Sequence, residues 1–196
     1  MKYTVFLDRD GVINVDSPDY IKTESEFVFI DKSPQAIAML RDAGFDVIVI
    51  TNQSVIARQY STQAELDKIF HKMNSGVKDA GGEIKDIFYC PHLPGFGCNC
   101  RKPNPGLIVQ AKDKYNIDLR HSCMIGDSAK DIECAKNAAC GLSVLVKTGN
   151  GKKAEKLLAI KGIKPDFVAE NLFDAVKWII AKNCSVKNVN IQNPDD

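Results

Sequence analysis

Residues 5–11 read Val-Phe-Leu-Asp-Arg-Asp-Gly, and the rest of the chain is organised around this stretch. Its apolar half predicts a short strand that is buried on both faces of a sheet. The strand ends in two carboxylates, Asp8 and Asp10, and an unpaired carboxylate there is costly unless a cation or hydrogen bonds compensate it. The pair suggests a metal ion and a reaction, with a plain exit of the strand into solvent as the alternative.

The composition is typical of one soluble globular domain. The chain has 196 residues, of which 44% are hydrophobic and 26% are charged, and its formal net charge is +1. This balance argues against a nucleic-acid binder or a membrane-surface protein, because such proteins usually carry a basic excess. We expect a monomer without nucleic-acid or membrane partners, with one domain over residues 1–182 and a polar tail over residues 183–196.

Two further features indicate the compartment. The expected first strand begins so close to the N-terminus that it leaves no room for a signal peptide, and no apolar run approaches the ~20 residues needed to cross a bilayer. The seven cysteines of such a chain favour metal binding or buried free thiols over disulfides. We therefore expect a cytoplasmic protein.

Strand and helix patterns alternate along the whole chain. Ser33-Pro34 and the capping box from Thr62 to Glu65 are typical helix starts, and Pro105 opens a further helix. The alternation predicts an α/β fold, a Rossmann-like three-layer sandwich with a mostly parallel central sheet. Residues 12–31 lack a helical period and are interpreted as a flap over the end of the first strand. The later strands are expected at residues 45–50, 84–89, 122–125, 142–146 and 167–168.

Polar side chains follow several of these strands. Ligands of open α/β sheets bind outside the carboxyl ends of the strands, so these side chains should meet at one edge. Each has a structural alternative, such as a hydrogen bond at the strand end, a helix cap or a solvated charge, but a joint occurrence favours a site. The side chains are Thr51 and Asn52 after the second strand, Arg101 and Lys102 after the third, and Asp127 and Asp131 after the fourth.

These segments together resemble the motifs of the haloacid-dehalogenase-like (HAD) phosphatases. Residues 8–11 are similar to the nucleophile motif of that family, residues 51–52 to its second motif, Lys102 to its third and residues 126–131 to its fourth. The resemblance covers the chain from residue 5 to about residue 180. It implies a HAD-like, capless phosphatase that uses Mg²⁺.

The resemblance also implies a role for each residue. Asp8 would attack phosphorus and form an aspartyl-phosphate. Two unit charges ~4 Å apart repel by about 4 kcal/mol at an effective dielectric near 20, so cations must offset the approach of a carboxylate to a phosphate. Mg²⁺ would be held by Asp8, Asp127 and the backbone carbonyl of Asp10, and Lys102 would add a second positive charge.

The remaining family roles concern hydrogen bonding and proton transfer. Thr51 would donate a hydrogen bond to the phosphoryl group, and Asp10 would protonate the leaving alcohol and then deprotonate the attacking water. Asp131 would orient Lys102 or the metal shell. Strand alternation turns Arg9 away from Asp8, so we assign Arg9 no catalytic role.

A separate group of metal-ligand residues lies between the third strand and the helix at Pro105. Three cysteines and one histidine form a closed tetrahedral set for a structural Zn²⁺, with free thiols or disulfides as the alternatives. The ion would pin a loop that has no core of its own and so hold Arg101 and Lys102 in place. The set is Cys90, His92, Cys98 and Cys100.

Within the HAD family, this loop resembles the group that contains heptose 1,7-bisphosphate phosphatases and histidinol-phosphate phosphatases. Residues 10–16 and 52–58 resemble the heptose enzymes more, which implies removal of the 7-phosphate of a sugar bisphosphate in the heptose branch of lipopolysaccharide synthesis. Val55 and Gln59 depart from the glycines common there and leave the sugar and its anomer open. The substrate-binding candidates are Asn52, Gln53, Ser54, Arg58 and Arg101, the two arginines being candidates for the distal phosphate.

Three other functions remain to be distinguished. A histidinol-phosphate phosphatase would differ only in the substrate pocket. A nucleic-acid 3′-phosphatase should have a basic groove, which the net charge does not suggest. A zinc-stabilised module that binds a phosphorylated ligand without turnover would not need both Asp8 and Asp10, and Mg²⁺-dependent phosphate release would separate it from the enzymes.

Overall fold

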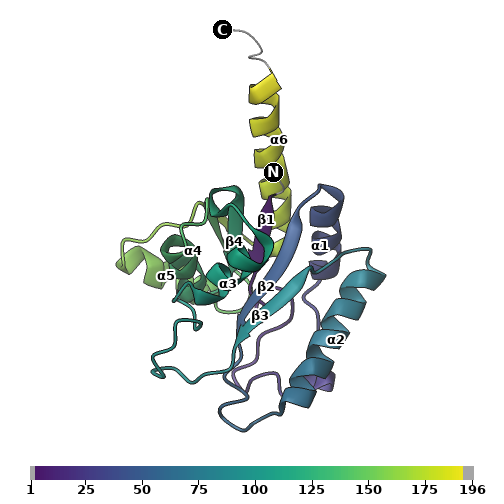
Figure 1. The fold of residues 1–196 in the computed structure, drawn as a ribbon, viewed down its shortest axis with the longest axis vertical. Coiled ribbons are helices and arrows are strands. Elements are labelled where there is room, and N and C mark those ends of the chain that lie inside the picture. Colours follow the sequence, from purple (N-terminus) through teal and green to yellow (C-terminus); the bar gives the residue numbers. More distant parts are fainter. Residues whose placement is uncertain (1–2, 192–196) are drawn as a thin grey trace.

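The computed structural model describes residues 3–191, and the side chains of residues 3–183. It confirms the expected three-layer α/β architecture (Figure 1). The strands are β1 (Thr4–Leu7), β2 (Asp46–Asn52), β3 (Asp86–Cys90), β4 (Ser122–Gly126), β5 (Leu142–Val146) and β6 (Phe167–Ala169). The helices are α1 (Ser33–Asp42), α2 (Gln63–Asp79), α3 (Gly106–Tyr115), α4 (Ala129–Asn137), α5 (Gly151–Ile160) and α6 (Leu172–Ile191), with short 3₁₀ turns at Glu24–Glu26 and Leu119–His121.

The six strands form one parallel sheet in the order β3-β2-β1-β4-β5-β6. The chain leaves β1 toward β2 and β3 on one side and crosses back to β4, β5 and β6 on the other. The order of the strands therefore reverses beside β1. Ligand sites of open α/β sheets lie at such a reversal, outside the carboxyl ends of the strands.

Helices cover both faces of the sheet, and β1 is therefore buried on both sides. Val5 and Leu7 belong to the core under α1, α2 and α6, and Phe6 belongs to the core under α3 and α4. A smaller apolar cluster joins α4 and α5 over β5. The strictly alternating contacts fix the register of β1, because a slip by one residue would exchange the two faces.

Two of three local details differ from the sequence-based expectations. Ser33 is the first residue of α1 and not its cap; Lys32 stands at the cap position, and the Ser33 hydroxyl donates to the Ile13 carbonyl oxygen at 2.6 Å. Helix α2 begins as expected, with Thr62 accepting a hydrogen bond from the Glu65 amide. β2 extends through Asn52, so the side chains of the second motif stand on the strand itself and not after it.

At the C-terminal end, the boundary expected at residue 183 falls inside α6, which runs to Ile191. Residues 192–196 of the expected tail lie outside the described residues. Throughout the part of the chain that the structure describes, each helix is too short or too polar to cross a membrane.

Candidate active site

The carboxyl ends of β1, β2 and β4 bring the predicted site residues together. Leu7 pairs with Val49 of β2 and with Ile125 of β4, so the residues that follow these positions leave the sheet side by side. The backbone amide of Asp8 continues the ladder by donating to the Ile125 carbonyl oxygen at 3.0 Å. Because hydrogen bonds fix these backbone positions, the side chains beyond them are held by the rigid sheet.

Lys102 enters this group from the loop between β3 and α3. Its side chain is 2% exposed, and its Nζ lies 2.9 Å from Asp8 Oδ1 and 2.6 Å from Asp131 Oδ1. Burial alone would lower the pKa of Lys102, but the charges of Asp131 and Asp8 raise it above the usual value. The ammonium is therefore held charged beside the expected nucleophile.

Asn52 fixes the backbone of Lys102 from the end of β2. The Asn52 side chain accepts a hydrogen bond from the Lys102 amide at 3.0 Å and donates one to the Lys102 carbonyl oxygen at 3.2 Å. The Lys102 Nζ also donates to the Ile50 carbonyl oxygen at 2.8 Å. These contacts join Lys102 to β2, so the sheet fixes the position of Lys102 although it lies in a loop.

Asp8, Asp127 and Asp131 form what we call the carboxylate cluster, in which one oxygen of each lies within 4.8 Å of the others. Burial, followed by the charge of Asp131, raises the pKa of Asp127 to about 8. Burial also raises the pKa of Asp8 to about 7, although the charge of Lys102 opposes this shift. Gly11 has a φ of +77° and abuts the Asp127 carboxylate, so a side chain at this position would both strain the backbone and displace the carboxylate.

Asp131 is the completely buried member of the cluster. Its Oδ2 accepts hydrogen bonds from the Ser128 amide at 3.0 Å and from the Ser128 hydroxyl at 2.7 Å, which caps α4, while its Oδ1 faces Lys102. The geometry therefore gives Asp131 the position of a residue that orients Lys102, one of the two roles expected from the sequence.

Asp10 lies apart from the cluster, in a shell of hydrogen-bond donors. Arg9 donates to both of its oxygens at 2.6–3.0 Å, and Asn14 and Gln53 donate at 3.0 and 2.9 Å. Burial would raise the pKa of Asp10, but the charge of Arg9 and these hydrogen bonds outweigh it and lower the pKa. The Gln53 amide also donates to Thr51 Oγ1 at 2.9 Å, and Thr51 lines the cleft described below.

The sequence did not reveal that Arg9 contacts Asp10 in the site. Strand alternation had turned it away from Asp8, and no role was assigned to it. The structure buries its guanidinium to 1% exposure against Asp10. The reason is that β1 ends at Leu7, so the alternation of a strand no longer governs the direction of the Arg9 side chain.

A cleft of about 390 Å³ opens over this arrangement. Ser17, Pro18, Tyr20 and Ile21 of the 12–31 segment line it, as expected for a flap over the end of the first strand. Of the predicted site residues, those that line the cleft are Asp8, Asp10, Thr51, Asn52, Gln53, Arg101, Lys102 and Asp127.

Apart from the four Cys/His residues, three predicted site residues do not line the cleft. Asp131 lies behind Lys102, and Ser54 is buried at 4% exposure with its carbonyl oxygen accepting from the Arg58 amide. The guanidinium of Arg58 lies 5.4 Å from the centre of the Tyr20 ring. Arg58 therefore supports the flap from behind, instead of facing the substrate as the sequence suggested.

The lining of the cleft also includes Asp16, Asn150 and Lys130, which were not among the site residues predicted from the sequence. The Asn150 amide donates to Asp127 Oδ2 at 2.7 Å, and its side chain donates to Asp16 Oδ2 at 2.7 Å. Asn150 thus links the flap to the carboxylate cluster. Asp16 and Lys130 lie within the motif segments 10–16 and 126–131, where no role was assigned to them, and Asn150 lies outside these segments.

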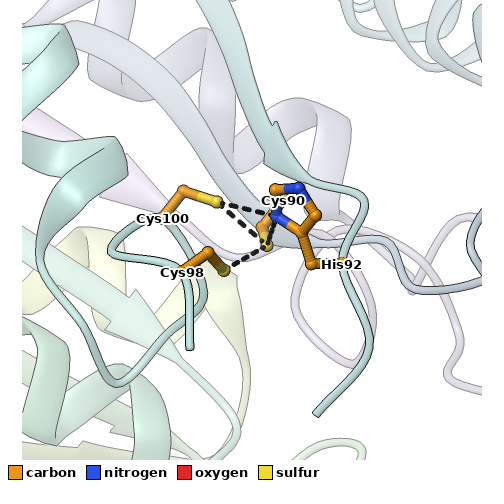
Figure 2. A group of neighbouring side chains, drawn as sticks. All are labelled: Cys90, His92, Cys98 and Cys100. Atoms are coloured by element: carbon orange, nitrogen blue, oxygen red, sulfur yellow. Dashed lines mark hydrogen bonds between the residues drawn. The ribbon is translucent and has the colours of Figure 1, made fainter. Parts of the chain in front are cut away.

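Cys90, His92, Cys98 and Cys100 form a second group, the Cys/His cluster, and their side chains point toward one another (Figure 2). The Cys90 sulfur lies 3.7 Å from the Cys98 sulfur and 3.2 Å from the Cys100 sulfur, and His92 Nδ1 lies 3.5 and 3.3 Å from the sulfurs of Cys90 and Cys100. Tetrahedral zinc with Zn–S bonds of ~2.3 Å separates its sulfur ligands by about 3.8 Å. The donor set and its spacing therefore fit Zn²⁺.

The Cys/His cluster is connected to the cleft through Arg101. The Arg101 side chain donates to the His92 carbonyl oxygen at 2.9 Å, and Asn104 donates to the Cys98 carbonyl oxygen at 2.8 Å. Both bonds lie within the segment that also carries Lys102. A change in the fold of this loop should therefore reach the Lys102 ammonium.

Comparison with known proteins places this site in a family. A HAD-hydrolase-like family model matches residues 99–175. The D-glycero-beta-D-manno-heptose-1,7-bisphosphate 7-phosphatase of Pseudomonas aeruginosa is 49% identical over 75% of this chain and 82% of its own length. The enzyme of the same name from Neisseria meningitidis serogroup A is 39% identical over 92% of this chain and 96% of its own.

A solved structure agrees with these relatives. The D,D-heptose 1,7-bisphosphate phosphatase of B. bronchiseptica, crystallised with magnesium and phosphate, superposes with a TM-score of 0.86 at 39% identity. The match covers 93% of this chain and 99% of that one. With the motif residues gathered at one edge of a parallel sheet, the chain belongs to the HAD-like hydrolases, in the family of the heptose-1,7-bisphosphate 7-phosphatases.

Proposed function

We propose that this protein is a Mg²⁺-dependent phosphatase that removes the 7-phosphate of D-glycero-D-manno-heptose 1,7-bisphosphate, a step toward nucleotide-activated heptose and lipopolysaccharide. The observation that carries the proposal is the buried Lys102 ammonium, which lies between Asp8 and Asp131 at the edge of the sheet. A charged lysine beside a nucleophilic carboxylate suits the transfer of a phosphoryl group. The two relatives described above carry this activity in their names and are 49% and 39% identical to the chain.

Asp8 is the proposed nucleophile. Its carboxylate would attack the phosphorus of the 7-phosphate, the P–O bond to the sugar would break, and an aspartyl-phosphate would remain. Lys102 offsets the repulsion between the two anions, and the Thr51 hydroxyl, whose oxygen accepts from Gln53, would donate a hydrogen bond to a phosphoryl oxygen. Water then hydrolyses the aspartyl-phosphate and restores Asp8.

Asp10 is the proposed acid and base. It would protonate the leaving sugar oxygen and then accept a proton from the attacking water. The hydrogen bonds from Arg9, Asn14 and Gln53 fix the direction of its carboxylate. They also favour its ionised form, so Asp10 must take up a proton as the phosphate dianion enters the cleft.

The carboxylate cluster fits Mg²⁺ by the chemistry of its donors. Asp8 and Asp127 offer hard oxygen ligands, and their raised pKa values reflect first their burial and then the nearby charge of Asp131. Hydrogen bonds from the described residues occupy Oδ1 of Asp8 and Oδ2 of Asp127, and leave the other oxygen of each available. Bound Mg²⁺, with the Asp10 carbonyl as a further ligand, would supply positive charge to the phosphoryl oxygens.

Zn²⁺ at the Cys/His cluster is a structural cofactor in this proposal. All four donors belong to the protein, so the ion would have no open position for a substrate. The proposal further includes a monomeric, cytoplasmic protein with a single domain that includes α6. The covering of both faces of the sheet by helices supports the single domain.

The test is Mg²⁺-dependent phosphate release from three substrates measured side by side: the β and α anomers of heptose 1,7-bisphosphate, and histidinol phosphate. The names of the relatives favour the β anomer, so we expect its kcat/KM to be the highest. A preference for histidinol phosphate would retain the mechanism and overturn the substrate. If no substrate releases phosphate faster than with an Asp8→Asn variant, the protein is a binding module and not an enzyme.

A further inference from the structure

The turn between β5 and α5 contacts the segments that follow β1 and β4 at three points. The Thr148 hydroxyl donates to the Gly11 carbonyl oxygen at 2.6 Å. Gly149 has a φ of +56°, and a side chain at this position would collide with Asp127 Oδ2. The Asn150 amide donates to the same carboxylate oxygen at 2.7 Å. The turn is therefore packed directly against a proposed ligand of Mg²⁺.

The side chain of Asn150 joins this turn to the flap. Its Nδ2 donates to Asp16 Oδ2 at 2.7 Å and lies 3.5 Å from Asp127 Oδ2. Asn150 stands at the cap position of α5, where asparagine commonly caps a helix, but its side chain makes no capping hydrogen bond. The contact between Asn150 and Asp16 is therefore not a consequence of helix capping.

The later part of the flap is attached on the other side of the cleft. The Ser61 hydroxyl, just before α2, donates to the Lys22 carbonyl oxygen at 2.6 Å. Asp16 comes six residues earlier in the flap and meets Asn150 instead. Asn150 therefore holds the first part of the flap beside the carboxylate cluster.

Two carboxylates, Asp16 and Asp127, lie against the single side-chain amide of Asn150. Their like charges repel, and one neutral amide offsets only part of the repulsion. Mg²⁺ at the other oxygen of Asp127 would offset much of the rest, so this position of the flap costs less free energy when the ion is bound. Coupling between two equilibria is reciprocal, so a flap held in this position raises the affinity for Mg²⁺ by the same factor.

We propose that Asn150 is a positioning residue that joins the flap to Asp127, so that the binding of Mg²⁺ and the placement of the flap over the cleft favour each other. The inference rests on the Mg²⁺ site of the proposed function, but not on its substrate. Asn150 acts through Asp16 and Asp127. The flap then covers the cleft mainly after the metal ion has bound.

The experiment measures hydrogen exchange of the flap by mass spectrometry, on the full chain without substrate, with and without Mg²⁺. Peptides from residues 12–31 report on the flap; they include the Ser17 amide, which donates to Asp16 Oδ1 at 2.9 Å. The variants are Asn150→Ala and Asp16→Ala, singly and together. Asn74→Ala is the matched control, because Asn74 is exposed on α2 and does not line the cleft.

We expect Mg²⁺ to slow exchange of the flap by about fivefold in the wild type and in the control, and by less than about twofold in Asn150→Ala. The Kd for Mg²⁺, measured by calorimetry, should rise by about fivefold in Asn150→Ala for the same reason. The double variant should lose no more than either single variant, since both break one contact. The melting temperature of metal-free Asn150→Ala should match that of the control, because the side chain caps no helix.

The outcomes separate this inference from the proposed function. If Mg²⁺ slows exchange equally in the wild type and in Asn150→Ala, or if the single losses add in the double variant, the coupling does not pass through Asn150. A wild-type flap that does not respond to Mg²⁺ overturns the inference, and Mg²⁺-dependent phosphate release by the same protein would leave the proposed function standing. An Asn150-dependent response in a protein that releases no phosphate supports the coupling and refutes the proposed function.

Discussion

The carboxylate cluster and the Cys/His cluster both gather metal-ligand side chains, but the fold supports them in opposite ways. The carboxylates stand at the ends of β1 and β4 or on the first turn of α4, where hydrogen-bonded strands fix their backbones. Three of the four Cys/His donors lie in a loop after β3, and Phe96, which stacks on His92 at 4.4 Å between ring centres, is 66% exposed. Figure 1 shows this loop extending away from the sheet between β3 and α3.

This difference shows what a metal ion would contribute at each cluster. The sheet would hold Asp8 and Asp127 in place without an ion, at the cost of raised pKa values. The loop has little apolar core of its own, so a bound ion would provide much of its folding free energy. Mg²⁺ should therefore matter for the chemistry and Zn²⁺ for the loop.

The largest effect is expected at the carboxylate cluster. Asp8→Asn keeps the shape of the side chain and removes the nucleophile, so kcat should fall by about 10³-fold or more. The melting temperature should not fall, because Asn removes a buried charge while Lys102 retains Asp131 as its partner. Phosphate release and thermal melting measure the two effects, with the exposed Asp113→Asn as the control. Loss of folding in Asp8→Asn would show that this cluster is structural.

A smaller loss of activity, with a loss of stability, is expected at the Cys/His cluster. Cys98→Ser removes a zinc ligand, so the loop should loosen and displace Arg101 and Lys102. We expect kcat/KM to fall by about 10- to 100-fold and the melting temperature to fall by several degrees. Cys140→Ser is the matched control, since Cys140 is half-buried outside the cluster. Normal zinc content and activity in Cys98→Ser would contradict the zinc assignment.

A third prediction concerns the donors around Asp10. Gln53→Ala removes the hydrogen bonds to Asp10 and Thr51 but leaves the carboxylate cluster intact. We expect kcat to fall by about tenfold while KM changes little, because Gln53 positions groups that act on the leaving oxygen and the phosphoryl group. Steady-state kinetics measure this split, with the exposed Gln63→Ala as the control. An effect on KM alone would make Gln53 a substrate-binding residue instead.

The smallest effect is a dependence of stability on pH and Mg²⁺. In the folded, metal-free protein the pKa of Asp8 is about 7 and that of Asp127 about 8, above the ordinary value of 3.8. The folded state then binds more protons than the unfolded state between about pH 4 and 8, so these groups make stability fall as pH rises through that range.

Mg²⁺ should reverse this loss by binding the ionised carboxylates. Saturating Mg²⁺ should therefore raise the melting temperature by a few degrees more at pH 8 than at pH 5, and the difference should shrink in Asp8→Asn. Thermal melting at the two pH values, with and without Mg²⁺, measures the difference. An equal gain at both pH values would mean that the ion binds elsewhere.

Much of this site could be predicted from the sequence, because its parts occur as local patterns. The apolar run before Asp8 indicates a buried strand, and the spacing of the acidic residues after Gly126 indicates a helix cap beside a strand end. The alternation of strands and helices then places those residues at one edge of the sheet. The Cys/His cluster was equally clear, since its donors lie close together in sequence.

What could not be predicted depends on side-chain direction beyond the ends of the strands. Arg9 turns onto Asp10 because the strand has already ended, and Arg58 turns onto Tyr20 because the flap folds over it. Lys130 stands inside the fourth-motif segment, but the packing of α4 places it on the cleft, and Asn150 reaches the cleft from the segment before α5. No local sequence pattern predicts these side-chain directions, because they depend on how the elements pack together.

The assignment of separate roles to two metal ions is tested most directly by brief chelation followed by the return of one metal at a time. Phosphate release from heptose 1,7-bisphosphate and the zinc content are measured on the same sample. We expect about one zinc ion per chain to survive mild chelation, activity to be lost, and Mg²⁺ alone to restore it. If activity returns only with added Zn²⁺, or persists when neither ion is present, the assignment of Mg²⁺-dependent catalysis to the carboxylate cluster and of loop stabilisation by Zn²⁺ to the Cys/His cluster is wrong.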